Sequence, residues 1–197
     1  SWKIAPALAS GNCVVAKPSE LTPVTAYLLS TWISEAGFPP GVFNVLHGLG
    51  PEVGEAMVTH PLIAAVSFTG GTATGARIAG HVAPQFKKMS LELGGKNPAI
   101  VFADADFDDA LKTTLRSSFA NQGQICLCGS RILVERPLYA KFRDALVAKA
   151  SAMVAGDPLH PSTKLGAVVS EAHMNKILGH IAKAQEELAE LERQQSG

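Results

Sequence analysis

Two side chains in this sequence stand where a nucleophile and a base could work. Cys126 follows a polar loop at residues 121–124, and such a loop can give a thiolate the exposure and the N–H donors that it needs. Glu92 lies between Leu91 and Leu93, and a carboxylate in apolar surroundings gains the basicity of a general base. An ordinary loop cysteine and a solvent-facing acid at a strand end are the alternatives for these two residues.

Two adjacent glycines could bind a phosphate. Gly70 and Gly71 follow an apolar run and open a predicted helix, where free backbone N–H groups and the positive end of the helix dipole favour an anion. Their spacing to Gly75 is not that of a GxGxxG motif, and Ala76-Arg77 replaces the Lys-Ser or Lys-Thr of a Walker motif. An ordinary tight turn between a strand and a helix is the alternative.

A lysine and a glutamate could bind a sugar. Lys17 and Glu20 come at the carboxyl end of a predicted strand at residues 13–16, and ligands of open α/β sheets bind beyond such ends. The carboxylate of Glu20 can accept hydrogen bonds from ribose hydroxyls, and Lys17 can donate to the same sugar or to a phosphate. A solvated charge pair at a helix entrance is the alternative.

The elements that must position these residues alternate along the chain. Apolar or β-branched runs predict strands, and Gly, Pro and N-cap residues mark the helices between them. We expect Gly11 to end the first helix, and Thr22 and Asp106 to be N-caps of later ones. The predicted strands are 13–16, 42–46, 64–68, 88–93, 99–102 and 131–135, and the predicted helices are 2–9, 23–36, a short one ending near 60, 74–83, 107–119, 138–154 and one from 170 towards 193. Strands separated by single helices pair in parallel, with right-handed crossovers.

This alternation predicts an α/β fold. Residues 1–93 would form a doubly wound, Rossmann-like parallel layer whose first strand is missing, and residues 94–184 would form part of a second α/β domain with the Cys126 loop. Residues 185–197 read as a polar tail. The strand at 13–16 is a continuous apolar run, so we expect it to be buried on both faces, with Cys13 as inert packing. We expect the same packing role for Cys128.

Composition excludes several classes of protein. Of the 197 residues, 47% are hydrophobic and 17% charged, which favours a folded core over disorder. The formal net charge is zero, so we expect no nucleic-acid partner. The sequence has no apolar run long enough for a bilayer and no charged-then-apolar leader, so we expect a cytoplasmic protein without membrane contact. Three cysteines and scattered histidines do not form a zinc motif, so we expect no metal.

Taken together, five segments resemble the aldehyde dehydrogenase superfamily. In family order they are AKPSELTP, EAGFPPGVFNVLHG, SFTGGTATG, LELGGKNPAIVFADAD and FANQGQICLCGSR. The resemblance covers residues 2 to about 186, and LELGGK followed by NQGQ-x-C is its most specific part. It implies an aldehyde dehydrogenase fold that is truncated at both ends in this chain. Residues 117–128 look most like the muconate-semialdehyde dehydrogenases, which oxidise semialdehydes of aromatic ring cleavage with NAD.

The resemblance also implies roles for the residues already singled out. Cys126 would attack the aldehyde carbonyl, its backbone N–H would supply half of the oxyanion hole, and Glu92 would activate the water that hydrolyses the thioester. Lys17 and Glu20 match positions that hold the adenosine ribose, which favours NAD over NADP. The positions that hold the pyrophosphate match Gly70 and Gly71, although the family usually has Ser where Gly71 stands. Trp2 and Lys3 match positions near the substrate tunnel.

Several family features fall outside these residues. The Pro-Trp-Asn segment, whose asparagine gives the second oxyanion donor, would precede the chain, and the Glu-x-Phe-Gly-Pro motif and the oligomerisation strands would follow it. From the resemblance we expect the full-length protein to be a homo-oligomer and the isolated chain to be poorly active. A non-catalytic remnant that binds a nucleotide or a partner is the alternative. An unrelated cysteine hydrolase ranks last, because only His160 occurs in the neighbourhood of Cys126.

Overall fold

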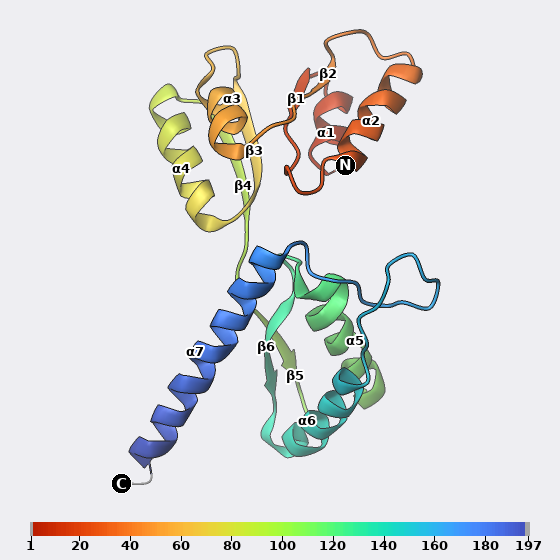
Figure 1. The fold of residues 1–197 in the computed structure, drawn as a ribbon, viewed down its shortest axis with the longest axis vertical. Helices are drawn as coiled ribbons and strands as arrows, with labels where there is room; N and C mark the ends of the chain where they lie inside the picture. The colour runs from red at the N-terminus through yellow and green to blue at the C-terminus, as the bar shows by residue number, and fades with distance from the viewer. Residues whose placement is uncertain (1, 196–197) are drawn as a thin grey trace. The chain divides into compact units, whose positions relative to one another are not determined.

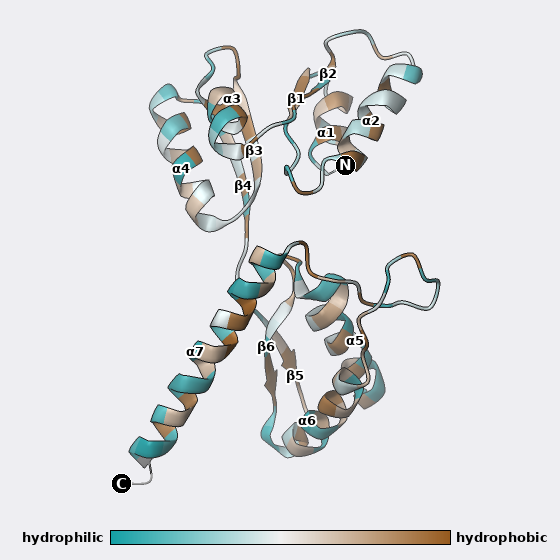
Figure 2. Cartoon of the chain, viewed as in Figure 1, coloured by the Kyte–Doolittle hydropathy of each residue, from teal (hydrophilic) through white to brown (hydrophobic). Residues whose placement is uncertain are grey.

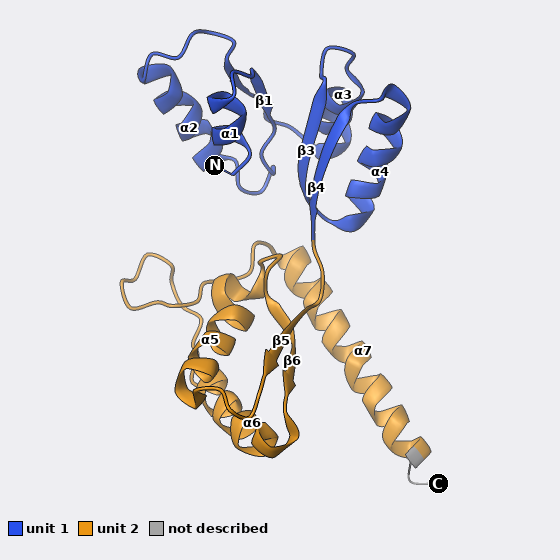
Figure 3. Cartoon of the chain, turned by 180° about the vertical axis from the view of Figure 1, so that it is seen from behind, with its two compact units in different colours: residues 1–93 blue, residues 94–197 orange. Residues whose placement is uncertain are grey.

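The computed structural model describes residues 2–195, which form two compact units. Among the described residues, unit 1 comprises residues 2–93 and unit 2 comprises residues 94–195 (Figure 3). Each unit has its own cluster of buried side chains, so each is described by itself. In the described part of the chain, no helix has both the length and the apolar character that crossing a bilayer requires.

The first half of unit 1 is a βαβ arrangement with a preceding helix (Figure 1). Its elements are α1 (Ile4–Ala9), β1 (Val14–Ala16), α2 (Val24–Glu35) and β2 (Phe43–Val45). Strands β1 and β2 pair in parallel, and Val14 lies opposite Phe43. Gly11 and Gly37, with φ of +80° and +84°, follow α1 and α2 and end them in the left-handed conformation that glycine tolerates.

The second half of unit 1 repeats the arrangement with longer strands. Its elements are η1 (a π-helical turn, Gly50–Gly54), α3 (Glu55–Thr59), β3 (Ala65–Gly70), α4 (Thr72–Val82), η2 (Ala83–Gln85) and β4 (Lys88–Leu93). Strands β3 and β4 pair in parallel over six residues. Val58, Ile78 and Val82 form the core beneath them, with Phe68 and Leu91 packed against it. The burial of these apolar side chains is the main force that holds α3 and α4 on the strands.

Polar contacts also tie the helices of this half together. Glu55 on α3 accepts from Arg77 (Nη2···Oε2, 2.8 Å) and lies 3.0 Å from His81 Nε2, both on α4. The hydrogen bond from Arg77 lowers the pKa of Glu55 below its ordinary value. Lys87 Nζ donates to the carbonyls of Val58 and His60 at 2.7 and 2.8 Å, so a cation satisfies carbonyls at the end of α3.

Unit 2 has a third parallel strand pair with helices packed on it. Its elements are β5 (Asn97–Val101), α5 (Phe107–Phe119), η3 (a 3-10 turn, Ala120–Gly123), β6 (Gly129–Val134), α6 (Arg136–Ser151) and α7 (Glu171–Gln195). Asp106 caps α5 by accepting from the backbone N–H of Asp109 at 2.8 Å, as the sequence predicts. Val101, Leu111 and Phe142 form the core between the strands and the two helices α5 and α6.

The other face of the β5–β6 pair carries apolar side chains that stay exposed. Ile100 and Leu133 are paired in the register and are 60% and 52% exposed. Figure 2 shows the apolar character of β5. Exposed apolar surface of this kind favours association, so another polypeptide segment could pack on this face.

The predicted α/β class with parallel strands is confirmed, and β4 has the predicted bounds. The strands form three separate pairs, β1–β2, β3–β4 and β5–β6, rather than one layer over residues 1–93. In a doubly wound sheet, the first strand lies between the second and the fourth.

Two expectations about strand and helix detail were wrong. The strand at 13–16 was expected to be buried on both faces, but Val15 is 37% exposed, because β1 has only one paired neighbour and little cover. Thr22 was expected to cap α2, but Pro23 occupies the N-cap position and no side chain bonds there. The tail assigned to residues 185–197 continues α7 to Gln195, and its last two residues lie outside the described part.

Candidate active site

Lys17 fastens the carboxyl ends of β1 and β2 to each other. Its ammonium group donates to the carbonyls of Pro18 and Gly48 at 2.7 and 3.0 Å and lies 3.3 Å from Glu20 Oε2. A backbone hydrogen bond to Glu20, and then the hydrogen bond from Lys17, lower the pKa of the Glu20 carboxyl. Glu20 is therefore ionised at neutral pH and, being exposed, can accept hydrogen bonds from a ligand.

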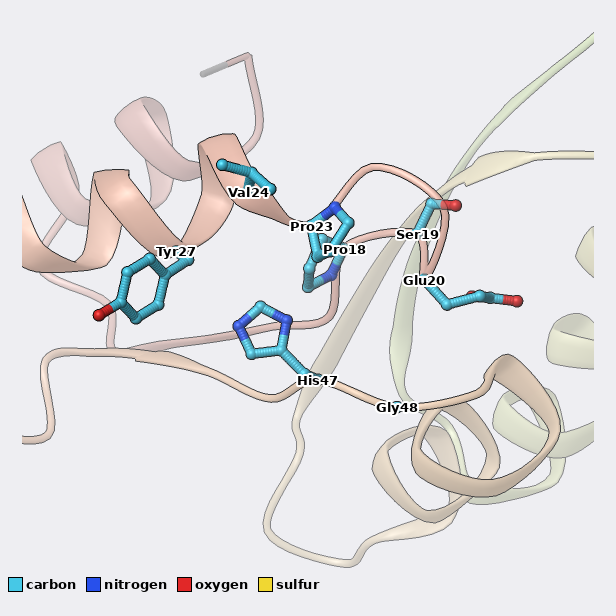
Figure 4. A pocket seen from close by; sticks show the side chains of 8 residues that line it. All are labelled: Pro18, Ser19, Glu20, Pro23, Val24, Tyr27, His47 and Gly48. Carbon is cyan, nitrogen blue, oxygen red and sulfur yellow. The ribbon is translucent and has the colours of Figure 1, made fainter. Parts of the chain in front are cut away.

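A hollow of about 400 Å³ lies beside this ion pair (Figure 4). Its lining residues are Pro18, Ser19, Glu20, Pro23, Val24, Tyr27, His47 and Gly48. Figure 4 shows the Glu20 carboxylate pointing away from the rings of Tyr27 and His47. The hollow thus has an apolar, ring-lined part and a separate anionic edge, which is a suitable division for a ligand with a flat part and hydroxyl groups.

The glycine turn lies between the carboxyl end of β3 and the start of α4. Gly70 is the last residue of β3, and Gly71 is the N-cap of α4 with its carbonyl bonded to the N–H of Gly75 at 3.0 Å. A Cβ at Gly71 would meet nothing within 4 Å, so a ligand can approach this backbone closely. At Gly75 a Cβ would lie 2.7 Å from Leu93 Cδ2, so this glycine allows close packing of α4 on β4.

Glu92 lies at the same end of the β3–β4 pair as the glycine turn. It is the register partner of Thr69, next to the pairing of Gly70 with Leu93. The expectation of apolar surroundings for Glu92 was wrong, because its side chain is exposed while its two leucine neighbours are half-buried. Alternation along the strand turns Glu92 to the side opposite Leu91 and Leu93, so neighbours in sequence do not bury it.

Cys126 is exposed on a loop with an unusual backbone. Asn121, Gln122 and Gly123 have successive φ values of +50°, +56° and +73°. Left-handed residues other than glycine cost about 1 kcal/mol or more each, so surrounding contacts must hold this turn. One such contact is the N–H of Val169, which donates to Gln124 Oε1 at 3.2 Å.

Serine and asparagine side chains fix the segment that follows Cys126. Gly129 donates its N–H to Ser117 Oγ at 3.1 Å, and its carbonyl accepts from Ser118 Oγ at 2.9 Å. Asn97 Nδ2 donates to the carbonyls of Cys126 and Cys128 at 2.6 and 3.1 Å. Asn97 belongs to the segment LELGGKNP, but it was not among the residues that we expected to act in the site. An asparagine directly before a proline at a strand start was the available signal.

The other two cysteines differ from each other in a way that was only half expected. Cys128 is buried, 6% exposed, which agrees with the packing role predicted for it. Cys13 was expected to be shielded within a strand, but it is exposed and precedes β1, which begins at Val14. Trp2 and Lys3, the two residues expected near the substrate tunnel, have different surroundings. The Trp2 side chain is 86% exposed, whereas Lys3 Nζ donates to Ser67 Oγ at 2.7 Å.

The structure brings some of the predicted site residues together. Lys17 and Glu20 are in contact, and the glycine turn shares one strand end with Glu92. Cys126 belongs to unit 2 and Glu92 to unit 1, so this pair is not brought together within either unit. Parallel strands with a glycine turn before a helix, and ligand-type side chains beyond the strand ends, are typical of nucleotide-binding α/β enzymes.

Comparison with known proteins gives the family. Residues 1–196 match the aldehyde dehydrogenase family. The chain is 53% identical over 191 residues to 2-aminomuconic semialdehyde dehydrogenase of Danio rerio, covering 97% of this chain and 39% of that protein. It is 43% identical to betaine aldehyde dehydrogenase of Vibrio vulnificus, covering 96% of this chain and 39% of that protein. The chain belongs to the aldehyde dehydrogenase family.

A solved structure supports the same assignment at the level of the fold. Betaine aldehyde dehydrogenase of Staphylococcus aureus, solved in complex with NAD+, superposes with a TM-score of 0.91 at 43% identity. The match covers 94% of this chain and 37% of that protein. The chain thus spans less than two fifths of the length of the relatives that it matches.

Proposed function

We propose that these residues are the nucleotide-binding and nucleophile-bearing part of an NAD-dependent enzyme that oxidises an aldehyde to a carboxylic acid. The observation that carries the proposal is Cys126, an exposed thiol on a loop held by hydrogen bonds, in a member of the aldehyde dehydrogenase family. A thiolate is a strong nucleophile toward carbonyl carbon, and exposure gives it access to one.

The chemistry divides into two steps at Cys126. In the first, the thiolate sulfur attacks the aldehyde carbon, and the carbonyl oxygen becomes an oxyanion that the N–H of Cys126 stabilises. NAD supplies the acceptor for the hydride that leaves when the C=O bond re-forms as a thioester. In the second, Glu92 takes a proton from water, the water oxygen attacks the thioester carbon, and the C–S bond breaks to release the acid and the thiolate.

The residues at the strand ends of unit 1 fit a dinucleotide. The ionised, exposed Glu20 can accept from the adenosine ribose hydroxyls while Lys17 holds it in place. Gly71 leaves open space at the start of α4, where the first N–H groups of the helix favour a pyrophosphate. We infer that this half of the protein binds NAD through these two contacts.

The substrate class follows the relatives. Those with 46–53% identity include 2-aminomuconic semialdehyde dehydrogenases from Danio rerio and Pseudomonas, whereas the betaine aldehyde dehydrogenases are at 43%. We therefore propose a semialdehyde of the muconate type, an aldehyde that carries a carboxylate, as the substrate of the whole protein.

Competitive alkylation tests the proposed nucleophile. With limiting iodoacetamide, Cys126 is expected to be labelled faster than Cys13, although both are exposed, because Cys126 is the proposed nucleophile on a loop held by hydrogen bonds, whereas Cys13 only precedes a strand. Peptide mapping by mass spectrometry gives both rates in one sample, and buried Cys128 reports that the protein stays folded. Equal labelling rates for Cys126 and Cys13 would mean that Cys126 is an ordinary loop cysteine. If the protein then still binds a nucleotide, the alternative of a non-catalytic remnant is favoured.

The second test concerns the choice of cofactor. Glu20 is expected to repel the 2′-phosphate of NADP, so NAD should bind more tightly by about tenfold at low ionic strength. Glu20→Gln should bring the two affinities closer, and Glu52→Gln, a change of another acid of unit 1, should leave their ratio unchanged. Calorimetric titration with each dinucleotide measures both ratios. NADP binding as tight as that of NAD in the unaltered chain would contradict the role of Glu20.

A further inference from the structure

One side-chain amide holds both carbonyls that flank the Cys126–Cys128 segment. A primary amide has two N–H donors, and Asn97 has two carbonyl acceptors within reach, at 2.6 Å for Cys126 and 3.1 Å for Cys128. Neither serine nor a carboxylate could donate to both carbonyls at once. The side chain of Asn97 is therefore matched to this segment in the number of its donors as well as in reach.

The peptide groups on both sides of Cys126 are fixed. The carbonyl of Ile125, the residue before Cys126, accepts a hydrogen bond from the N–H of Cys128 at 3.1 Å. Because a peptide is planar and trans, the N–H of Cys126 points the opposite way, and within residues 2–195 it has no acceptor. Asn97 holds the next carbonyl, that of Cys126 itself. Together these bonds restrain φ and ψ of Cys126 and leave its N–H free for a ligand.

The backbone of Asn97 is itself well held. It is the first residue of β5 and pairs with Gly129 of β6, just beyond the segment that it bonds. Pro98 follows it and restricts it to an extended conformation, and the register shifts between these two residues. The sheet thus fixes the backbone of Asn97, so the side-chain amide can hold the loop in one position.

We propose that Asn97 is a positioning residue that sets the backbone of Cys126 for attack on a carbonyl group. The inference rests on the proposed function, since it requires Cys126 to be the nucleophile. Without Asn97, the peptide after Cys126 can rotate, and the sulfur and the free N–H no longer keep their relation to one reacting carbonyl. Attack on a carbonyl needs that relation, whereas alkylation needs only the thiolate.

Two electrophiles separate these requirements without any cofactor. p-Nitrophenyl acetate acylates the thiolate: a C–S bond forms at the acetyl carbon, the ester C–O bond breaks, and p-nitrophenolate leaves with the electron pair. Iodoacetamide alkylates the same sulfur at a saturated carbon, with iodide as the leaving group. Both rates are measured at Cys126 in a Cys13→Ser background, with the p-nitrophenolate burst for acylation and peptide mapping for each product.

The variants are Asn97→Ala, Asn97→Asp and the control Asn175→Ala on the exposed face of α7. Asn97→Asp keeps the shape of the side chain but places a carboxylate against two carbonyl oxygens. We expect both Asn97 variants to slow acylation by about tenfold or more and to change alkylation by less than about threefold. The control variant should change neither rate. Protection of Cys128 from alkylation shows which samples are folded, and rates are compared in those.

The outcomes are distinguishable. Acylation that falls while alkylation stays supports the positioning role. Unchanged acylation in a folded Asn97 variant, or acylation and alkylation that fall in parallel, overturns it and leaves the nucleophile assignment intact. If unaltered Cys126 is not acylated, and Cys126→Ala gives the same burst, the proposed function fails and the positioning role fails with it.

Discussion

A polypeptide restricted to these 197 residues is expected to form NADH from a semialdehyde at least about 1,000-fold more slowly than a full-length member of the family. The resemblance places the asparagine that gives the second oxyanion donor outside these residues, and loss of one such donor typically costs about 10²–10³ in rate. By the same resemblance, the Glu-x-Phe-Gly-Pro motif, whose carboxylate would anchor the nicotinamide ribose, also falls outside them, and misplacement of the reacting groups adds a further loss.

Features of the structure point in the same direction. Cys126 and Glu92 are both exposed, so neither unit by itself excludes water from them. The two residues belong to different units, so the geometry of the second step is not fixed within either one. Exposed Ile100 and Leu133 favour association over a defined active site. The polypeptide of these 197 residues should therefore keep the reactivity of the Cys126 thiol and a weak affinity for the nucleotide, although it forms little NADH.

Absorbance of NADH at saturating NAD measures the rate, with a full-length relative and Cys126→Ala assayed alongside. The protein is separated by size-exclusion chromatography before the assay, so that the rate belongs to the monomer. A monomer that oxidises the semialdehyde at the rate of the full-length relative, with activity lost in Cys126→Ala, would contradict the expectation.

Local signals in the sequence predicted local structure well. Gly11 ends α1 because only glycine adopts φ of +80° at little cost, and Asp106 caps α5 because its carboxylate reaches a free N–H of the first turn. The alternation of strands and helices predicted parallel pairing, which is confirmed. These features depend on a few neighbouring residues, so the pattern contains what is needed to infer them.

Burial and contacts distant in sequence could not be predicted in the same way. Cys13 and Glu92 stand in apolar stretches but are exposed, because burial depends on which elements cover a strand. Asn97 and Cys126 lie 29 residues apart, and only the pairing of β5 with β6 brings the amide to the loop. A sequence motif identifies the residues of such a site, whereas the hydrogen bonds that orient them require the fold.

The largest effect on stability is expected for Phe142→Ala. Phe142 is completely buried, and its ring meets that of Phe107 edge to face at 5.9 Å between centroids. Truncation of a buried phenylalanine to alanine costs about 3–5 kcal/mol, and a domain is typically stable by only about 5–15 kcal/mol. Unit 2 has a small core, so a substantial part of its stability should be lost.

The three cysteines allow this loss to be located. A cost of about 3 kcal/mol raises the unfolding equilibrium constant more than about 100-fold, so alkylation of buried Cys128 should accelerate to that extent in Phe142→Ala. Cys13 should keep its rate, because the core of unit 1 is a separate cluster. Tyr139→Ala, at a half-exposed position of the same helix, should leave Cys128 protected. Protection of Cys128 in Phe142→Ala would mean that the Phe142 cluster does not hold the segment after Cys126, and that α5 and β6 position the nucleophile loop without α6.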